Sequence, residues 1–545
     1  MVPLRRGPRV VAQPAAACAP VPESLEPGPS AHGGPDRAAR VDAAPPWAHP
    51  RCGRLGVWLG LLVLAGCGGA RVDRPESRVP SLTLQPCQLR APGSSQSLAA
   101  DCGALVVRTS ADPGEPNTLT LKVAVLAAVS RNAAPDPLYY LAGGPGQAAS
   151  ESFPESAAAF QRIRRQRDIV LIDQRGTGGS GALRCPGEVD DPEGSDVDRA
   201  RAVAEWARAC IAGLDADLDH YTTSDAVRDL EASAEALGYP QVNVYGISYG
   251  SRLAQAWART HPERIRSLVL DGVVPLETAL GDDIARDAQT ALDLIFDRCA
   301  SDPDCNGRFG RLAPRFERLM RTLERHPVRV VLDHPVRAEA IALEMDRDRA
   351  ATVFRFASYA PETVALIPLL IDAAEGRADY RPLAAQYLLL SEALDQSIAS
   401  GLHSAIVCSE DVPFLSADPT TVAPDAGYLA DLVATRLRQV CDVWPAADLP
   451  PGLHEPLRGG PPSLLLSGAV DPVTPPRNAK RVATRLTDVL QLVAPGQGHG
   501  VVGRGCIPKL VAEFLDAGSG RGIDSRCVDA IEPNAFFLDP IGPAP

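Results

Sequence analysis

Positive charge is scarce in this sequence of 545 residues, in which 54 Lys and Arg face 67 Asp and Glu. The resulting net charge of −13 repels phosphate backbones, so the composition argues against a nucleic-acid partner. Histidine is also rare, with 9 residues, and no C-x-x-C pair recurs along the chain. These two shortages argue against a zinc site, and neither a metal nor an organic cofactor is predicted.

Long hydrophobic runs are equally few. The run "LGVWLGLLVLAGC" at 55–67 follows Arg51 and Arg54, is too short to span a bilayer comfortably, and has the charged flank of a secretory signal. Its end, Leu64-Ala65-Gly66-Cys67, resembles the lipobox of bacterial lipoproteins, which implies that Cys67 becomes the lipidated N-terminus. A plain cleaved signal is the alternative. The sequence therefore predicts a lipid-anchored protein of the bacterial cell envelope or periplasm, or a secreted one if the lipobox is not used.

Ten of the 13 cysteines lie beyond this leader. They fall into neighbouring pairs along the chain, which is typical of local disulfides formed in an oxidising compartment. We pair them in chain order, with buried free thiols as the alternative. The predicted pairs are Cys87–Cys102, Cys185–Cys210, Cys299–Cys305, Cys408–Cys441 and Cys506–Cys527.

The order of predicted elements indicates an α/β fold with a mostly parallel, doubly wound sheet. Strands and helices alternate up to "SLVLDGV" at 267–273, helical periodicity then dominates, and strand–helix alternation resumes at "PSLLLSG". This pattern predicts a helical lid inserted into the core and laid across the carboxyl ends of its strands. The predicted parts are a disordered or misassigned extension (1–50), a lipoprotein-type signal (51–66), a first core part (67–274), the lid (275–461) and a second core part (462–545).

Two local features of the first core part are also predicted. The runs "ALVVRTS" and "LTLKVAVLAAV" between 104 and 129 read as a hairpin across the turn signal "DPGEPN". In "SDAVRDLEASAEALG", Ser224 is expected to cap the N-terminus of a helix that Gly238 ends.

The pentad Gly246-Ile247-Ser248-Tyr249-Gly250 lies between an apolar alternating run and a segment with helical spacing. A G-x-S-x-G match alone has little weight, because Gly and Ser are common. A strand-to-helix turn is, however, the place where small neighbours lift a serine hydroxyl into a cleft. Ser248 is therefore the candidate nucleophile, and a small residue in a tight turn is the alternative.

Two later residues complete a candidate triad. Asp471 follows the penultimate predicted strand, and His499 follows the last one. A serine needs a base to take its proton, and the base needs an acceptor to hold its tautomer. Asp471 also fits a turn before Pro472, and His499 also fits a glycine-flanked loop. The order Ser, Asp, His and the position of all three after parallel strands favour the catalytic interpretation.

Acyl transfer also needs donors for the oxyanion. The backbone N–H of Tyr249 is one candidate, and Gly143 and Gly144 in the loop "AGGPG" supply the second, with a plain glycine turn as the alternative. Asp173, Arg175 and Gly176 in "DQRGTGGS" are expected to brace this loop rather than to react.

These motifs together resemble the α/β-hydrolase fold, and within it the prolyl and tripeptidyl aminopeptidases. The resemblance rests on "GGPG", "DQRGTGGS", "VNVYGISYGSRLAQAWARTHPERIRSLVLDG", "GAVDPVTPP" and the C-terminal "GQGHG" with Cys506 and Cys527, and it extends from about Cys87 to Cys527. Ala142 is a departure, because prolyl aminopeptidases usually have a histidine before "GGPG". The resemblance implies a serine exopeptidase acting on peptides with a free N-terminus.

In such exopeptidases acidic residues on the lid side hold the substrate's amino group, which is largely cationic at neutral pH. The stretch "SAIVCSEDVPF" offers Glu410, the first choice, and Asp411. A solvated acidic pair is the alternative for both. The predicted function is cleavage of residues or short peptides from peptide N-termini through an acyl-enzyme on Ser248. An esterase or other small-molecule hydrolase on the same fold and a non-catalytic envelope binding protein are the rival hypotheses.

Overall fold

The computed structural model describes residues 82–542, apart from 113, 186, 188–195, 282 and 416–426. The extension (1–50), the signal (51–66) and Cys67 lie outside the described residues. Within the described ranges, none of the helices combines the length and the hydropathy that a membrane crossing requires.

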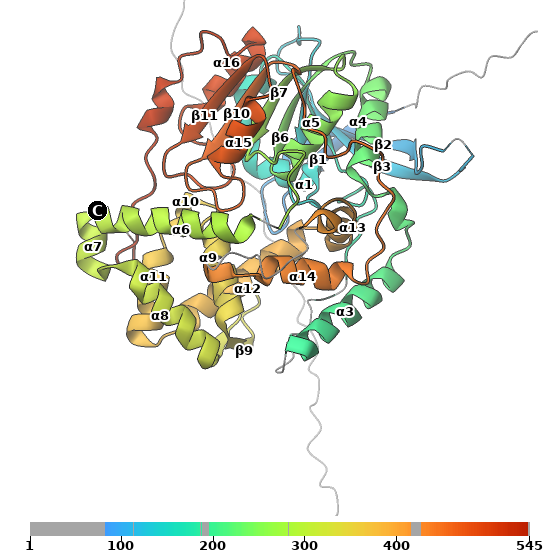
Figure 1. The fold of residues 1–545 in the computed structure, drawn as a ribbon. Helices are drawn as coiled ribbons and strands as arrows, with labels where there is room; N and C mark the ends of the chain where they lie inside the picture. The colour runs from blue at the N-terminus through green and yellow to red at the C-terminus, as the bar shows by residue number, and fades with distance from the viewer. Residues whose placement is uncertain are drawn as a thin grey trace, which may run out of the picture. The chain divides into compact units, whose positions relative to one another are not determined.

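A nine-stranded sheet forms the core, with the strand order β1-β2-β3-β5-β4-β6-β7-β10-β11 (Figure 1). β1 to β2, β2 to β3 and β3 to β5 pair antiparallel, and all later neighbours pair parallel. The mostly parallel sheet and the predicted β2–β3 hairpin are thus confirmed. The strands are β1 (Gln85–Leu89), β2 (Leu98–Arg108), β3 (Thr118–Leu126), β4 (Leu138–Leu141), β5 (Ile169–Ile172), β6 (Val242–Ile247), β7 (Ile265–Asp271), β10 (Ser463–Gly468) and β11 (Val489–Ala494).

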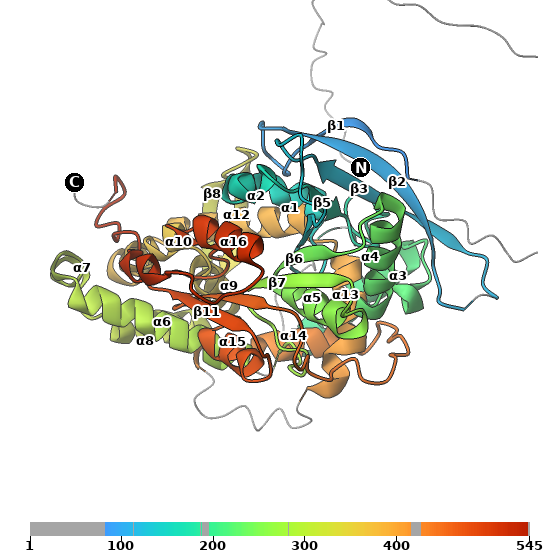
Figure 2. The same cartoon turned by 90° about the horizontal axis from the view of Figure 1, so that it is seen from above.

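Helices cover both faces of this sheet (Figure 2). Successive residues of a strand point to opposite faces, so Tyr139 packs with Trp257 of one helical layer while Tyr140 packs with Phe153 of the other. Both faces are buried, which explains why the central strands are almost continuously apolar. The helices around the sheet are α1 (Ala149–Ser156), α2 (Gln161–Arg164), α3 (Asp196–Gly213), α4 (Thr223–Leu237), α5 (Tyr249–Thr260), α15 (Pro476–Ala483) and α16 (Ile507–Ala517).

The N-terminus of α4 differs from the prediction that Ser224 caps it. Thr222 is the cap, because its side chain accepts from the Asp225 N–H while the Asp225 carboxylate accepts from the Thr222 N–H. This reciprocal pair satisfies two of the N–H groups that a helix start leaves without partners, which a cap at Ser224 would not. Gly238 ends the helix in the left-handed conformation, as predicted.

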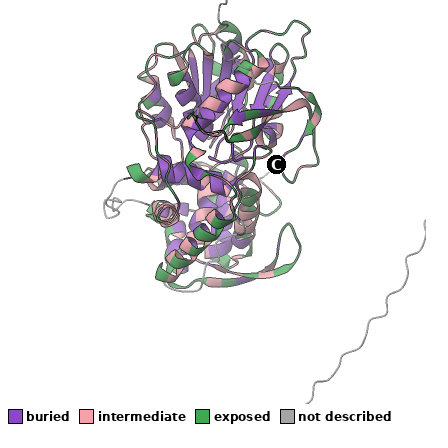
Figure 3. Ribbon diagram, turned by 90° about the vertical axis from the view of Figure 1, so that its right-hand side faces the viewer, coloured by how far each residue is buried: buried purple, intermediate pink, exposed green. Residues whose placement is uncertain are grey.

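Between β7 and β10 the chain forms a mostly helical segment, called the lid below, most of whose helices share a hydrophobic cluster built around Leu292, Phe316 and Phe354. Figure 3 shows buried residues both along the strands of the sheet and between the lid helices. The lid helices are α6 (Ile284–Ser301), α7 (Pro303–Phe309), α8 (Leu312–Arg325), α9 (Arg347–Ala357), α10 (Pro361–Val364), α11 (Ile367–Ile371), α12 (Arg381–Ser397), α13 (Ser400–Glu410) and α14 (Leu432–Cys441).

Two features of the lid were not expected from the sequence. Residues 328–345 form an antiparallel hairpin, β8 (Val328–Asp333) with β9 (Ala340–Met345), in the helical block. The helical pattern at 362–374 is divided into α10, α11 and one π-helical turn. Pro368 explains the division, because proline lacks an N–H and is accommodated only in the first turn of a helix.

All five disulfides predicted in chain order are present. Their Cα–Cα distances lie between 4.8 and 6.3 Å, within the usual range for the bond. Cys408–Cys441 joins α13 to α14, and Cys506–Cys527 closes the segment after β11.

Candidate active site

Ser248 lies on the turn between β6 and α5, with φ 55° and ψ −123°. A non-glycine residue at positive φ is strained, and such strain is typical of functional turns. Glycine is required on either side by close backbone approach. A Cβ on Gly246 would lie 2.2 Å from the Gly250 carbonyl oxygen, and one on Gly250 would lie 2.3 Å from the Leu141 carbonyl oxygen. The glycines of the pentad therefore make the sharp turn sterically possible.

His499 is held from one side of its ring. Its Nδ1 lies 2.9 Å from Asp471 Oδ2 and 3.0 Å from Thr474 Oγ1. Since the Thr474 hydroxyl donates to Asp471 Oδ2 over 2.7 Å, the proton on Nδ1 faces two oxygen acceptors. A neutral ring in this arrangement has an unprotonated Nε2, which is the atom that a general base needs.

Asp471 and His499 shift each other's pKa. Burial acts to raise the pKa of Asp471, but the charge of His499 and the hydrogen bonds from His499 and from the Thr474 and Val473 amides outweigh it, so the pKa is lowered. Burial acts to lower the pKa of His499, but the charge and the hydrogen bond of Asp471 outweigh it, so the pKa is raised. The pair therefore favours an ionised Asp471 at neutral pH.

One large cavity, with a volume of about 850 Å³, is lined by both Ser248 and His499. The loops that hold them are in contact, because a Cβ on Gly500 would lie 2.8 Å from Cδ1 of Ile247. Much of the remaining wall of the cavity comes from the lid, including Tyr387 and Leu394 of α12. Ser248 and His499 thus line one cavity at the carboxyl edge of the sheet, and Asp471 contacts His499 from behind.

The predicted oxyanion residues lie against Ser248. A Cβ on Gly143 would lie 3.2 Å from Cβ of Ser248, and Gly143, Gly144 and Tyr249 all line the cavity. Tyr249 is the first residue of α5, where a helix N–H has no partner within the helix. The backbones of two segments therefore border the space beside the serine.

The lid holds the loop that contains Gly143 and Gly144. The Ala399 N–H donates to the Gly146 carbonyl over 2.9 Å, and His403 Nδ1 lies 3.1 Å from the Pro145 carbonyl oxygen. Burial lowers the pKa of His403, so its ring is neutral at neutral pH. A carbonyl oxygen only accepts, so the neutral ring donates from Nδ1.

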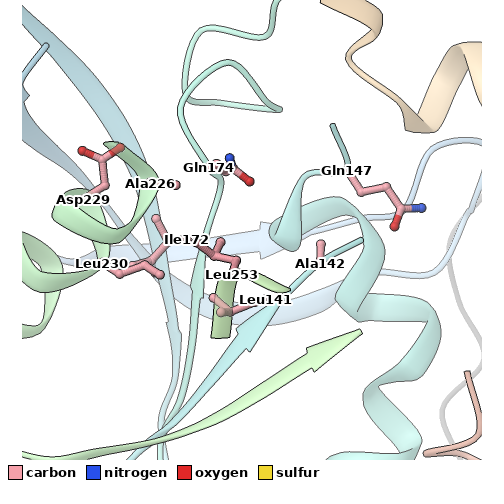
Figure 4. A pocket seen from close by; sticks show the side chains of 9 residues that line it. All are labelled: Leu141, Ala142, Gln147, Ile172, Gln174, Ala226, Asp229, Leu230 and Leu253. Carbon is pink, nitrogen blue, oxygen red and sulfur yellow. The ribbon is translucent and has the colours of Figure 1, made fainter. Parts of the chain in front are cut away.

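A small cavity of about 20 Å³, with room for one water molecule, lies behind this loop. Figure 4 shows the side chains that line it. Its lining comes from β4, β5, α4, α5 and the loop that carries the glycines: Leu141, Ala142, Gln147, Ile172, Gln174, Ala226, Asp229, Leu230 and Leu253.

The motif "DQRGTGGS" braces this region, as the sequence suggested. Arg175 is fully buried and donates to both carboxylate oxygens of Asp229 over 2.7 Å. Asp173 accepts from the N–H and the hydroxyl of Ser150 at the start of α1 and from the Gly179 N–H. Both residues tie the segments that flank the active-site loop to the body of the core.

Glu410 and Asp411 are both buried, but their surroundings differ. Glu410 accepts from the N–H and the hydroxyl of Thr223, each over 2.6 Å, at the N-terminus of α4. Asp411 accepts through Oδ1 from Arg252 over 2.9 Å and from the Leu280 N–H over 2.8 Å. Asp411 is among the residues that line the large cavity, and Glu410, the first choice from the sequence, is not.

Burial raises the pKa of Glu410 to about 7, against which the hydrogen bonds from Thr223 and the charge of Arg252 act. The Thr223 hydroxyl also lies 2.9 Å from the phenol oxygen of Tyr249. Glu410 is therefore linked through Thr223 to the residue that follows Ser248.

Sequence reasoning did not find two residues that hold the site. Thr474 was detectable, because Asp471-x-x-Thr474 is a spacing at which a side chain meets a nearby backbone N–H, here over 2.8 Å. Asp271, at the end of β7, is fully buried and accepts from the Val501 and Val502 N–H groups after His499. Nothing in the local sequence indicates that Asp271 reaches a loop more than two hundred residues away.

Comparison with known proteins gives matches over most of the chain. Residues 136–304 match the family model described as alpha/beta hydrolase fold, and residues 428–527 match the model described as TAP-like protein. The serine protease Hip1 of Mycobacterium tuberculosis is 25% identical over 527 residues, covering 86% of this chain and 97% of that protein.

Two further relatives match over a shorter stretch. The tripeptidyl aminopeptidase of Streptomyces lividans is 32% identical over 152 residues, which is 25% of this chain and 28% of that protein. The proline iminopeptidase of Neisseria gonorrhoeae is 35% identical over 146 residues, which is 26% of this chain and 35% of that protein.

Proposed function

We propose that this chain, which belongs to the α/β-hydrolase family and carries a TAP-like C-terminal segment, is an aminopeptidase that works through an acyl-enzyme on Ser248. Its relatives include a serine protease, a tripeptidyl aminopeptidase and a proline iminopeptidase. The observation that carries the proposal is the 2.9 Å contact between His499 Nδ1 and Asp471 beside the cavity that Ser248 lines.

In the proposed mechanism, His499 Nε2 takes the proton of the Ser248 hydroxyl as its oxygen attacks the scissile carbonyl. The N–H of Tyr249 and that of Gly143 or Gly144 stabilise the oxyanion. When the C–N bond breaks, His499 gives the proton to the leaving amine. Water then attacks the ester by the same route in reverse, and Asp471 holds the ring throughout.

The deciding experiment compares aminoacyl and tripeptidyl arylamides with their N-acetylated counterparts. An aminopeptidase should cleave the free-amine substrates and lose most activity on the blocked ones. Ser248→Ala should abolish both activities. Equal turnover of blocked and free substrates would favour the esterase alternative, and failure of a fluorophosphonate probe to label Ser248 would favour the non-catalytic binding protein.

The substrate's amino group is proposed to meet Asp411. Both hydrogen bonds that the Asp411 carboxylate accepts from described residues use Oδ1, so Oδ2 can accept from a substrate ammonium. Asp411→Asn should lower kcat/KM for free-amine arylamides far more than for simple esters. Glu410→Gln is the matched control and should leave that ratio unchanged, because Glu410 does not line the cavity. If only the Glu410 variant lost its preference for free-amine arylamides over esters, Glu410 would be the amine anchor, as first chosen from the sequence.

Export and lipid anchoring at Cys67 are proposals of the same kind. The five disulfides support an oxidising compartment, and Leu64–Cys67 supports lipidation. Metabolic labelling with a fatty acid should mark the wild-type protein and not Cys67→Ser. Equal labelling of the two would remove the anchor, leaving a plain cleaved signal as the alternative.

A further inference from the structure

Arg355, on α9, lines the large cavity on the side of His499. One turn further along the chain, the Tyr359 carbonyl accepts the His499 N–H over 2.7 Å. The Tyr359 ring also packs edge-on against the imidazole, with 5.2 Å between centroids. The segment of the lid that carries Arg355 and Tyr359 therefore contacts His499, the proposed general base.

The guanidinium of Arg355 has no carboxylate partner among the described residues. Its Nε is buried without a hydrogen bond, its terminal nitrogen lies 3.5 Å from the Tyr359 phenol oxygen, and its charge stands 5.0 Å from the centroid of the Phe356 ring. Arg252, which lines the same cavity, has Asp411 at 2.9 Å. Arginine offers five donors, so an unpaired, half-buried guanidinium can receive an anion.

The chemistry of the proposed reaction determines which part of a substrate lies on this side. His499 gives its proton to the leaving amine, so the leaving group must lie next to His499 while the acyl group lies toward Gly143 and Tyr249. When the leaving group is a single amino acid or a very short peptide, its α-carboxylate follows that amine within a few bonds. A planar carboxylate matches the fork of a guanidinium.

We infer that Arg355 binds the free α-carboxylate of the leaving group, so that the enzyme favours short peptides whose C-terminus falls just beyond the scissile bond. This inference rests on the proposed aminopeptidase function and names the substrate class of the same site. It assigns a binding role on the leaving-group side, opposite to the amine anchor at Asp411.

Most other ionisable groups that line the cavity are paired, neutral or acidic, so they are poorly suited to bind a carboxylate. Asp283 and Asp287 face Arg477, and His403, which is neutral, faces the Pro145 carbonyl. Asp395 of α12 is acidic and would repel a carboxylate. Arg436 of α14 also lines the cavity, but its charge acts on the Asp348 carboxylate at the start of α9, so it serves as the matched control.

The test uses three substrates that share the acyl group cleaved best by the wild-type protein. One carries an arylamide, one a leaving amino acid with a free carboxylate, and one the same amino acid as its amide. For wild type, kcat/KM should be higher for the free acid than for the amide. Arg355→Met should lower that ratio by roughly 10- to 100-fold, the range for a lost charge-assisted hydrogen bond, with most of the loss in KM.

Turnover of the arylamide should be retained in Arg355→Met, Arg355→Lys should keep part of the ratio, and Arg436→Met should keep all of it. An equal loss on all three substrates, or a ratio unchanged in Arg355→Met, would overturn the inference, as would loss of the ratio in Arg436→Met instead. The arylamide has no leaving-group carboxylate, so it tests the proposed function independently of Arg355. If the wild-type protein failed to cleave the free-amine arylamide, the proposed function itself would be wrong.

Discussion

At the scale of single residues, the site depends on side chains whose own positions are fixed by others. Ser248 holds a positive φ because its N–H donates to the Asp271 carbonyl and its own carbonyl accepts from Ser251. His499 is fixed by Asp471, Thr474 and the Tyr359 carbonyl. Such supported geometry keeps reacting groups aligned without reorganisation during the reaction.

Removal of the Thr474 hydroxyl tests this support. Thr474→Val deletes its bonds to both Asp471 and His499, and kcat should fall by roughly 10- to 100-fold, the equivalent of a hydrogen bond to a charged group. Thr474→Ser keeps the hydroxyl and should retain most of the activity. Unchanged kcat in the valine variant, with circular dichroism confirming a folded protein, would show that Asp471 alone orients the ring.

The pH dependence of the reaction follows from the raised pKa of His499. The base acts only when neutral, so kcat/KM should fall as pH drops through a pKa above the ordinary value of 6.5. Asp471→Asn removes the charge that raises this pKa, so the acidic limb should move to lower pH while kcat falls by about 10⁴-fold. A pH–rate profile of both proteins measures this, and an unmoved limb would contradict the assignment of that limb to His499.

At the scale of elements, α13 is the part of the lid that reaches the core at several points. Its N-terminal end meets the active-site loop through Ala399 and Gly146, and its C-terminal end meets α4 through Glu410 and Thr223. Cys408–Cys441 joins the same helix to α14. Because α13 contacts both α4 and the loop that contains Gly143 and Gly144, a shift of α13 would also move that loop.

Glu410 should make the contact of α13 with α4 sensitive to pH. Its pKa in the folded protein is about 7, above the ordinary 4.5, so its contribution to stability is complete below pH 4.5 and is lost as pH rises to about 7. By linkage the loss amounts to roughly 3 kcal/mol at most. The free energy of unfolding of Glu410→Gln, measured by urea at pH 5 and pH 7.5, should lack this component.

The exposed Glu513 of α16 provides the matched variant. Glu513→Gln should follow the wild-type dependence of stability on pH. If Glu410→Gln follows the wild type as closely, the carboxyl group is not held in its protonated form by burial.

At the scale of the whole molecule, the large cavity lies between the sheet core and the lid, most of whose helices share a hydrophobic cluster while α13 packs into the cluster of the sheet. Buried polar contacts connect the two at several points, and the ion pair between Arg252 of α5 and Asp411 at the end of α13 is one of them. Both side chains are almost fully buried, at 5% and 1% exposure. Breaking a buried pair leaves a charge without a partner, which is more costly than the loss of a surface pair.

Asp411→Ala should therefore loosen the lid on the core. Loss of one member of a buried pair lowers the free energy of unfolding by about 3–5 kcal/mol, and amide hydrogen exchange in α13 and α14 should accelerate more than in the central strands. Asp524→Ala removes an exposed pair with Arg526 and should change neither measurement. Uniform acceleration across the sheet and the lid would indicate global destabilisation instead.

Much of this molecule could be predicted locally. The strand–helix alternation, the order Ser248, Asp471, His499 and the pairing of neighbouring cysteines depend on periodicity, turn geometry and short separations along the chain, so the sequence alone determined them. The cap at Thr222 and the hairpin at 328–345 also depend on local sequence, but both were missed. Ser224, close to Thr222, was an equally suitable cap residue, and the helical periodicity on both sides of 328–345 hid the hairpin.

What only the tertiary structure decided are the contacts between segments distant in sequence. Asp271 supports the loop after His499, Glu410 turns to Thr223 while Asp411 lines the cavity, and Arg355 is left without an acidic partner in the described chain. The choice between two adjacent carboxylates depends on which way a helix end faces its neighbours. That direction is set by the packing of the lid on the core, and no local pattern in the sequence encodes it.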